Sequence, residues 1–332
     1  MNLQRRIDLL IRLGGWMQGN DPAWLEAKKK ATAENPWFIP EFIELAVKNI
    51  LEQFLQKNIL QDWTQHYHIP DEQPKPKNVG IVMAGNLPLV GFHDLLSSFI
   101  IGHKTIIKLS SKDSALIKQL VEVVNSWEPE TNDLIQFSEM LKNCDAYIAT
   151  GSNNTSRYFE YYFSKWPHII RKNKTSVAIL TGKEKNDQLE KLADDVYQFF
   201  GLGCRNVTKI YIPENYDFVP LLAAFKKYNW LADHHKYRNN YDYNLTIQIL
   251  NKKFYMTNGS ILLIENPSLF SPISQLNYEY YTDESTVLAS LEKKEELQAI
   301  VSGRHIPPGQ AQSPSITDYA DRIDTLSFLS SI

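Results

Sequence analysis

Two spacings of hydrophobic positions succeed each other along the chain. Up to about residue 70 the apolar side chains recur every three or four positions, as Phe42, Ala46 and Ile50 do, which is typical of helices with one buried face. The segment 70–77, Pro-Asp-Glu-Gln-Pro-Lys-Pro-Lys, ends this pattern because prolines interrupt it. We therefore predict a helical N-terminal region with its linker at 1–77, packed on the domain that follows.

From residue 78 onward, short apolar runs alternate with helical patterns. Continuous apolar runs indicate strands that are covered on both faces. The predicted strands are 79–84, 105–109, 145–150, 176–180, 207–212, 260–264, 276–280 and 297–301. The predicted helices are 89–101, 114–125, 153–165, a helix from about 189 up to Gly201, and 218–228. This alternation predicts an α/β fold with parallel sheets, in which ligands bind at the carboxyl ends of the strands.

Composition and charge argue against several classes of protein. Hydrophobic residues make up 43% and charged residues 22% of the chain, which is ordinary for a soluble globular protein. The net charge of −3 leaves no basic surface for nucleic acid or for a membrane. No apolar run approaches the ~18 residues of a membrane span, and the amphipathic N-terminus is unlike a signal peptide. We expect a cytoplasmic enzyme or binding protein.

One of the two cysteines lies between a predicted helix and a predicted strand. The segment 199–206, Phe-Phe-Gly-Leu-Gly-Cys-Arg-Asn, places Cys204 directly after two glycines. Glycine is common just past a helix end because it adopts a left-handed backbone at little cost. A thiol on such a bend is exposed and oriented, as a nucleophile requires. The alternative is a small buried hydrophobic residue, and two thiols, Cys144 and Cys204, make no disulfide framework.

Three further segments follow predicted strands. Asn86, in Gly-Asn-Leu-Pro-Leu, offers an amide donor of the kind that stabilises an oxyanion, or else it caps the next helix. Lys108 ends the second strand and suits ribose hydroxyls or phosphate, unless it is an ordinary surface lysine. Gly151 and Ser152 join a strand to a helix whose N-terminal amides suit a pyrophosphate, although the segment lacks the Gly-x-Gly-x-x-Gly pattern.

Taken in order, these segments resemble the aldehyde dehydrogenase superfamily. The likeness extends over about 78–302 and is carried by the segments 85–89, 104–111, 151–152, 180–183 and 203–204. The chain looks most like the acyl-CoA reductase branch, which includes the long-chain acyl-CoA reductase component of bacterial luminescence systems. The segment 270–272, Phe-Ser-Pro, is similar to the Phe-Gly-Pro segment that contacts the nicotinamide ribose in this superfamily.

The resemblance implies an aldehyde-dehydrogenase-like fold and a reaction. It implies a Rossmann-like NADPH-binding domain at 78–183, a second α/β, catalytic domain at 184–302, and a C-terminal tail at 303–332 near the active site. Cys204 would be the nucleophile that accepts the acyl group, and the Asn86 amide, with the backbone N–H of Cys204, would hold the thioester oxyanion. The expected reaction is reduction of a fatty acyl-CoA, or another acyl thioester, to the aldehyde. The implied cofactor-binding residues are Lys108, Ser111, Gly151, Ser152, Thr181, Gly182 and Phe270, with no metal ion.

Departures from the superfamily pattern refine this expectation. Ile179 aligns with the glutamate that activates water in hydrolytic members, which argues against ordinary aldehyde oxidation. Ser111 stands where many members have a glutamate after the ribose-binding lysine. Without that glutamate a 2′-phosphate is not repelled, which favours NADPH. Ser268 stands where a further ribose-binding glutamate is common. The chain is also shorter than most members, so we expect a homo-oligomer, if one forms, to use trimmed or rebuilt contacts.

Two other classes of protein fit the same residues. One is an acyl-transfer protein that uses Cys204 without a hydride step, and the other is a non-catalytic nucleotide-binding subunit. His234 and His235 are adjacent and lack the i, i+4 spacing of a metal-binding pair. We expect a structural or solvated role for both.

Overall fold

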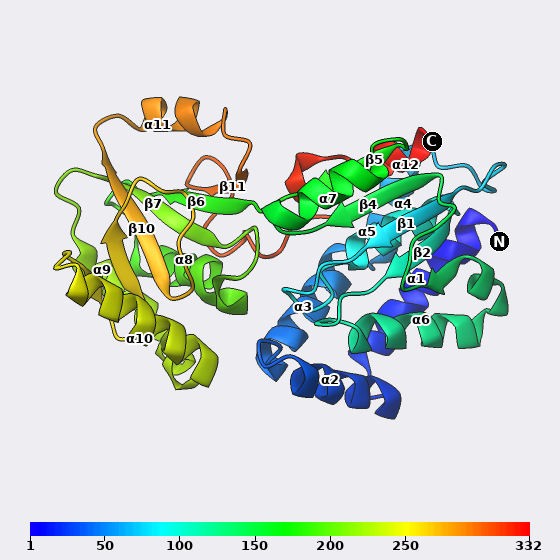
Figure 1. The fold of residues 1–332 in the computed structure, drawn as a ribbon, viewed down its shortest axis with the longest axis horizontal. Coiled ribbons are helices and arrows are strands. Elements are labelled where there is room, and N and C mark those ends of the chain that lie inside the picture. Colours follow the sequence, from blue (N-terminus) through cyan, green and yellow to red (C-terminus); the bar gives the residue numbers. More distant parts are fainter. The chain divides into compact units, whose positions relative to one another are not determined.

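The chain forms two units, each built around its own sheet (Figure 1). The computed structural model describes residues 1–332. The first unit comprises residues 1–173 and 314–332, and the second comprises residues 174–313. The chain therefore passes between the units twice, after residue 173 and after residue 313. The predicted α/β class with a helical N-terminus is confirmed.

Five parallel strands form the sheet of the first unit, in the order β3-β2-β1-β4-β5. The strands are β1 Asn78–Val82, β2 Lys104–Lys108, β3 Ile135–Phe137, β4 Ala146–Thr150 and β5 His168–Arg171. The helices after β1, β2 and β4 are α5 Phe92–Ile101, α6 Ala115–Trp127 and α7 Asn153–Phe163, and the 3-10 helix η1 is Pro129–Asp133. Val82 is in register with both Lys108 and Ala149. The carboxyl ends of these three strands therefore lie at one edge of the sheet.

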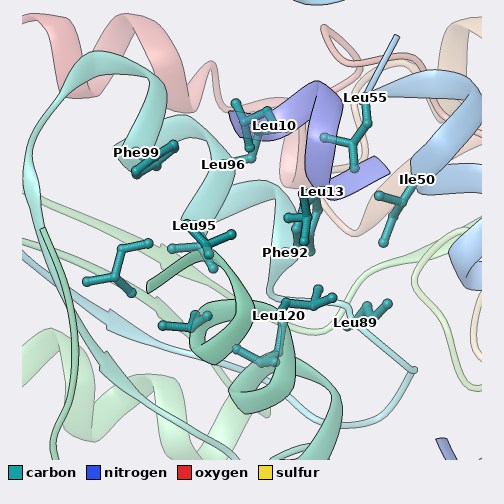
Figure 2. Close-up of a cluster of buried hydrophobic side chains, with 14 of the residues drawn as sticks. Leu10, Leu13, Ile50, Leu55, Leu89, Phe92, Leu95, Leu96, Phe99 and Leu120 are labelled. Carbon is teal, nitrogen blue, oxygen red and sulfur yellow. The ribbon is translucent and has the colours of Figure 1, made fainter. Parts of the chain in front are cut away.

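Four N-terminal helices share a hydrophobic core with this sheet. They are α1 Leu3–Gln18, α2 Pro22–Glu34, α3 Pro40–Gln53 and α4 Lys57–His66. Leu10 and Leu13 of α1 lie near Phe92 of α5 in the cluster that Figure 2 shows, and Leu120 of α6 joins them. Burying one such side chain contributes about 1.5–3 kcal/mol, so the N-terminal helices are an integral part of the first unit. None of the helices in the structure is long and apolar enough to cross a membrane.

The end of the chain is fastened to the first unit by buried polar contacts. The segment contains the 3-10 helix η4 Ala320–Arg322 and the helix α12 Thr325–Ser330. Arg171 at the end of β5 forms a buried ion pair with Asp94 and donates to Thr325 Oγ1 at 2.8 Å. The buried ring of His103 contacts the Leu329 carbonyl oxygen through Nε2 at 2.9 Å. Because these contacts lie among apolar side chains, their loss would leave buried polar groups without partners.

The second unit contains a six-stranded sheet in the order β11-β6-β7-β10-β9-β8, parallel except for β8. The strands are β6 Thr175–Ile179, β7 Val207–Pro213, β8 Met256–Thr257, β9 Leu262–Glu265, β10 Gln275–Tyr281 and β11 Leu297–Val301. The helices are α8 Asn186–Tyr197, η2 Gln198–Gly201, α9 Phe218–Ala224, η3 Phe225–Asp233, α10 His235–Leu250 and α11 Glu284–Leu291. The alternation of strands and helices continues here, as predicted from the sequence.

The boundary between the units differs from the predicted one. We placed the strand at 176–180 in a cofactor domain that ends at 183, whereas β6 lies in the second unit, which begins at residue 174. The reason is hydrogen bonding, because β6 pairs with β7 on one side and with β11 on the other. The tail 303–332 also divides, since residues up to 313 belong to the second unit and the remainder to the first.

One local prediction is corrected, and one helix was not predicted. The helix expected to reach Gly201 ends at Tyr197, because Gln198 leaves the helical conformation and residues 199–201 are left-handed. The tyrosine- and asparagine-rich stretch after Asp233 is the helix α10, whose buried side chains include Tyr237, Tyr241 and Asn244. An apolar periodicity cannot identify a helix whose buried stripe is made of tyrosine and amide side chains.

Candidate active site

Cys204 lies in a tight turn of the second unit, between the end of α8 and the start of β7, and it is half-buried. Before it, Phe199, Phe200 and Gly201 have left-handed backbone, with φ of 54°, 58° and 73°. This conformation costs an ordinary L residue about 1–2 kcal/mol, and burial of both phenylalanine rings offsets that cost. The sharp bend that leads into Cys204 is therefore held by packing and not by glycine alone.

Side chains from two directions bind the backbone of this turn. The turn 203–206 is closed by a hydrogen bond from the Asn206 N–H to the Gly203 carbonyl oxygen at 3.1 Å. The Oδ1 atom of Asn206 accepts the Gly203 N–H at 2.8 Å. Ser176 Oγ donates to the Cys204 carbonyl oxygen at 3.1 Å. Asn206 and Ser176 are both fully buried, so the backbone on both sides of the cysteine is fixed from within the protein.

Thr181 and Gly182 do not lie beside Cys204. Cys204 precedes β7 whereas Thr181 follows β6, and these neighbouring strands are parallel. The two groups therefore lie at opposite edges of the sheet, separated by a strand that rises about 3.3 Å per residue. The N–H groups of Thr181 and Gly182 instead donate to the Glu184 carboxylate, at 2.6 and 3.1 Å. This separation argues against a role for this pair in holding a cofactor at the cysteine.

Ile179 is likewise far from the position that the resemblance suggested. Its side chain is 3% exposed and packs with Val177, Tyr211 and Leu297 in the core of the second unit. The residues of β6 that reach the Cys204 turn are those at its start, Thr175 and Ser176. Neither is a carboxylate, so the beginning of β6 brings no water-activating base to the cysteine.

Phe270 lies at the same edge of the second sheet as Cys204. Its loop precedes β10, which is parallel to β7, and its ring is 40% exposed. The loop is held by Asn277, whose Nδ2 atom donates to the carbonyl oxygens of Ser268 and Phe270 at 3.0 Å each. Thr208, directly after the first residue of β7, donates to the Leu269 carbonyl oxygen at 2.7 Å. The unit thus brings the cysteine turn and an exposed aromatic ring to one edge of its sheet.

In the first unit, Asn86 is exposed on a tightly packed loop after β1. It does not cap α5, whose N-cap residue is Gly91, so the capping alternative is wrong. A side chain at Gly85 would clash with Ser110, which requires glycine there. Leu89 has left-handed backbone with φ of 59°, and its N–H donates to Asp113 Oδ2 at 2.8 Å. Burial raises the pKa of Asp113 to about 7.

The predicted cofactor residues of the first unit gather at the carboxyl edge of its sheet. Lys108 ends β2 and is exposed, and Ser111 is exposed in the loop that follows. Ser152 is the N-cap of α7 and accepts the Thr155 N–H at 3.3 Å. A Cβ atom at Gly151 would lie 2.9 Å from the Phe159 ring, so only glycine fits where the backbone enters α7. Helix N-terminal amides and a lysine at one edge suit an anionic ligand.

A further buried carboxyl lies on α8, near the cysteine turn. The two oxygens of Asp195 accept the N–H groups of Gly309 and Ala311, at 2.6 and 2.9 Å. The side chain is fully buried, and burial raises the pKa of Asp195 to about 7 against the opposing effect of these hydrogen bonds. Asp195 thus anchors the last segment of the second unit to the helix that ends at the cysteine turn.

Sequence reasoning missed the polar residues that support the site, Asp113, Ser176, Asp195, Asn206 and Asn277. The signal for Ser176 was present, because it is the one polar residue of the predicted strand 176–180, and such a residue is buried only with hydrogen-bond partners. His234 caps α10 through Nδ1, which accepts the Tyr237 N–H at 3.4 Å.

A family model for acyl-CoA reductase (LuxC) matches residues 21–220, which is more than half of the 332-residue chain. The chain belongs to the acyl-CoA reductase (LuxC) family. The matched region contains Asn86, Lys108, Gly151 and Cys204. As a member of this family the protein is an oxidoreductase enzyme, and the family suspected from the sequence is confirmed. Comparison with curated protein sequences finds no match.

Solved structures with the same fold are aldehyde dehydrogenases. An enzyme from Mycobacterium tuberculosis complexed with NAD+ is 13% identical, with a TM-score of 0.64 over 87% of this chain and 70% of that one. Aldehyde dehydrogenase 21 from Physcomitrella patens, in complex with succinate, is 13% identical, with a TM-score of 0.66 over 88% and 71%. An NAD-dependent aldehyde dehydrogenase from Sinorhizobium meliloti is 11% identical, with a TM-score of 0.63 over 87% and 68%. These similarities confirm the aldehyde-dehydrogenase-like fold.

Proposed function

We propose that this member of the acyl-CoA reductase family reduces a fatty acyl-CoA, or another acyl thioester, to the aldehyde with NADPH, through a thioacyl-enzyme on Cys204. The observation that carries the proposal is the turn at Cys204. The thiol is half-buried, and hydrogen bonds from Asn206 and Ser176 hold the adjacent backbone. Cys144, by contrast, is 3% exposed, and burial raises the pKa of its thiol. A nucleophile must be both accessible and oriented, and only Cys204 meets both conditions.

The reaction then follows from the chemistry of a cysteine thiolate. Cys204 attacks the carbonyl carbon of the acyl thioester, and the CoA thiolate leaves, so that the acyl group is joined to the Cys204 sulfur. The Asn86 amide and the backbone N–H of Cys204 stabilise the oxyanion that forms during this step. NADPH, when bound, supplies the hydride that reduces the new thioester carbonyl. Collapse of the resulting thiohemiacetal on Cys204 releases the aldehyde and returns the thiolate.

The residues of the first unit fit a nicotinamide dinucleotide. Gly151 and Ser152 begin α7, whose N-terminal amides suit the pyrophosphate. Lys108 is an exposed cation at the same edge of the sheet, and it suits the adenosine ribose. Ser111 is exposed and carries no charge that would repel a 2′-phosphate, which favours NADPH over NADH. In the second unit, Phe270 suits a contact with the nicotinamide ribose. The bound NAD+ of the M. tuberculosis enzyme supports a cofactor of this class.

The acyl-enzyme should resist water. Thr175 and Ser176, the residues of β6 that contact the cysteine turn, provide no carboxylate, and a general base is commonly worth about 10²–10⁴ in rate. We expect acyl-CoA mixed with the enzyme to give a long-lived adduct on Cys204, detected by intact mass with peptide mapping. Adding NADPH should discharge the adduct as aldehyde, and adding free CoA should return acyl-CoA.

The same experiment distinguishes the proposal from its rivals. An adduct that NADPH leaves untouched would indicate an acyl-transfer protein, and the absence of any adduct on Cys204 would indicate a non-catalytic subunit. An adduct that hydrolyses within one turnover would favour NAD(P)-dependent aldehyde oxidation. Each of these results contradicts the proposed reduction.

A further inference from the structure

The Asn206 side chain connects the end of α8 to the start of the turn that carries Cys204. Its Oδ1 atom accepts the Gly203 N–H at 2.8 Å, directly before Cys204. Its Nδ2 atom donates to the carbonyl oxygens of Asp195 at 3.0 Å and Gln198 at 2.9 Å, at the end of α8. The side chain is completely buried. One amide group therefore provides hydrogen-bond partners both for carbonyl oxygens at the end of α8 and for the Gly203 N–H at the start of the turn.

The helix end depends on this amide because of the unusual backbone that follows. A helix commonly ends with one left-handed residue. The N–H groups of that residue and of the residue after it then donate to the last carbonyl oxygens of the helix. Here three successive residues, 199–201, are left-handed, and carbonyl oxygens at the end of α8 receive the Asn206 side chain. Removing that side chain would leave the carbonyl oxygens of Asp195 and Gln198 without this donor. The residues before the left-handed segment 199–201 would then lose the hydrogen bonds that connect them to the cysteine turn.

Both peptide groups that flank the Cys204 Cα atom are tied down. The carbonyl oxygen of Gly203, on the peptide that contains the Cys204 N–H, accepts the Asn206 backbone N–H at 3.1 Å. The carbonyl oxygen of Cys204, on the following peptide, accepts Ser176 Oγ–H at 3.1 Å. Fixing both peptide planes fixes the φ and ψ angles of Cys204. The directions of its Cα–Cβ bond and of its N–H are thereby set.

We propose that Asn206, together with Ser176, is a positioning residue that aims the Cys204 thiol and backbone N–H at the acyl carbonyl carbon and its oxygen. The catalytic part of this statement rests on the proposed function of Cys204 as the nucleophile. The orientation of the thiol rests only on the contacts around the turn. The two parts can therefore be tested by different measurements.

Truncation of Asn206 should lower the rate of the chemical step more than it weakens substrate binding. Misplacement of a reacting group by 1 Å costs on the order of 100-fold in rate, so Asn206→Ala should lower kcat for acyl-CoA reduction by about 100-fold. The KM for acyl-CoA should change little, because Asn206 is buried and touches no substrate. Ser176→Ala removes one hydrogen bond and should lower kcat by about tenfold.

The experiment uses the full-length protein carrying Cys144→Ala, so that Cys204 is its only thiol. The rate of alkylation of Cys204 by iodoacetamide is measured against pH, and kcat and KM are measured on the same preparations. Asn206→Ala should change the alkylation rate, the apparent pKa of the thiol, or both. Asn206→Asp, which keeps an acceptor for the Gly203 N–H but loses the donors to α8, should recover part of the lost kcat.

Asn244→Ala is the matched control. Asn244 is also a buried asparagine of the second unit, and its Nδ2 atom donates to the Ile273 carbonyl oxygen at 2.9 Å and not to any residue of the turn 203–206. This variant should lose stability while Cys204 alkylation and kcat stay at the parent values. If Asn206→Ala matches Asn244→Ala in both measurements, the positioning role is overturned.

Two further outcomes are informative. Should Asn206→Ala fail to fold, Ser176→Ala decides, and unchanged alkylation and kcat in that variant would overturn the proposal. Should the parent form no acyl adduct, the proposed function fails, yet a change of alkylation in Asn206→Ala would still support the orientation of the thiol.

Discussion

The loop that carries Asn86 and the segment that leads into Cys204 both contain strained backbone, and different kinds of side chain hold it in place. Each lies at an edge of a parallel sheet, and each contains left-handed residues other than glycine, Leu89 in one and Phe199 and Phe200 in the other. In each, one buried side chain accepts a backbone N–H next to the strained segment. In the first unit the acceptor is Asp113, and in the second it is Asn206.

The two acceptors differ in their chemistry. Asp113 is a carboxyl group with a pKa raised to about 7, and its Oδ1 atom makes no hydrogen bond with the protein. Asn206 does not titrate, and both ends of its amide are bonded. We infer that the hydrogen bond from the Leu89 N–H to Asp113 changes in strength with pH around neutrality, whereas the hydrogen bond from the Gly203 N–H to Asn206 does not.

The largest effect is expected from Cys204→Ala. Removal of the nucleophile should lower aldehyde formation by at least about 10³-fold, while the fold is retained because a small residue replaces a half-buried one. Cys144→Ala is the control in the first unit. It should leave kcat unchanged and lower the free energy of unfolding by about 1 kcal/mol. The measurements are NADPH oxidation and denaturant unfolding. Equal activity in Cys204→Ala and the parent would remove the proposed mechanism.

The second largest effect, a loss of kcat, is expected from Asn86→Ala. Loss of one oxyanion donor commonly lowers kcat by about 10²–10³-fold. Because Asn86 is exposed and does not cap α5, the free energy of unfolding should change little. NADPH affinity, measured by fluorescence titration, should also stay at the parent value. A loss of stability with unchanged kcat would instead assign Asn86 a structural role and end the parallel between the two loops.

Replacing Ser111 by glutamate should shift the cofactor preference toward NADH by about tenfold, the factor that 1.4 kcal/mol of repulsion gives. The new carboxylate would repel a 2′-phosphate but could accept a hydrogen bond from a 2′-hydroxyl group. Lys183→Glu is the control, because it replaces a positive charge by a negative one at an exposed position at the carboxyl edge of the second sheet, a larger change of charge than in Ser111→Glu. The ratio of kcat/KM for NADPH and NADH is the measurement. A parent enzyme that strongly prefers NADH would contradict the proposed cofactor.

The smallest effect is expected in how the free energy of unfolding depends on pH. The pKa of Asp113 rises from 3.8 in the unfolded chain to about 7 in the folded one, so the folded state binds the extra proton between these values. The carboxyl group therefore makes the protein less stable as pH rises from about 4 to about 7, by at most about 1.4 kcal/mol per pH unit. Asp113→Asn should remove this component, and urea unfolding across pH measures the difference from the parent.

Asp195→Asn should remove a similar component from the second unit, because burial also raises its pKa to about 7. Asp113→Asn should in addition flatten the pH profile of kcat, since Asp113 binds the Asn86 loop. A kcat profile that stays unchanged in Asp113→Asn would show that the comparison of the two loops has no functional consequence.

Local patterns in the sequence were sufficient for much of this protein. The alternation of apolar runs and amphipathic segments predicted most strands of both sheets, because burial on two faces leaves a direct mark on composition. The segments at Asn86, Lys108, Gly151 and Cys204 stand where a strand or helix ends, and punctuation by glycine and polar residues reveals such positions. These are properties of a residue and its neighbours in the chain.

What the sequence could not decide depends on which strands pair. The segment at Thr181 and Gly182 looked like part of the site, yet β6 is parallel to β7, and this direction carries the segment to the edge opposite Cys204. The assignment of β6 to the second unit, and the division of the C-terminal segment between units, follow from hydrogen bonds between distant residues. The role of Asn206 is of the same kind, because its amide acts only once the end of α8 and the cysteine turn have been brought together. The tertiary structure decided these features, since a pattern of neighbours holds no information about strand direction or about partners far along the chain.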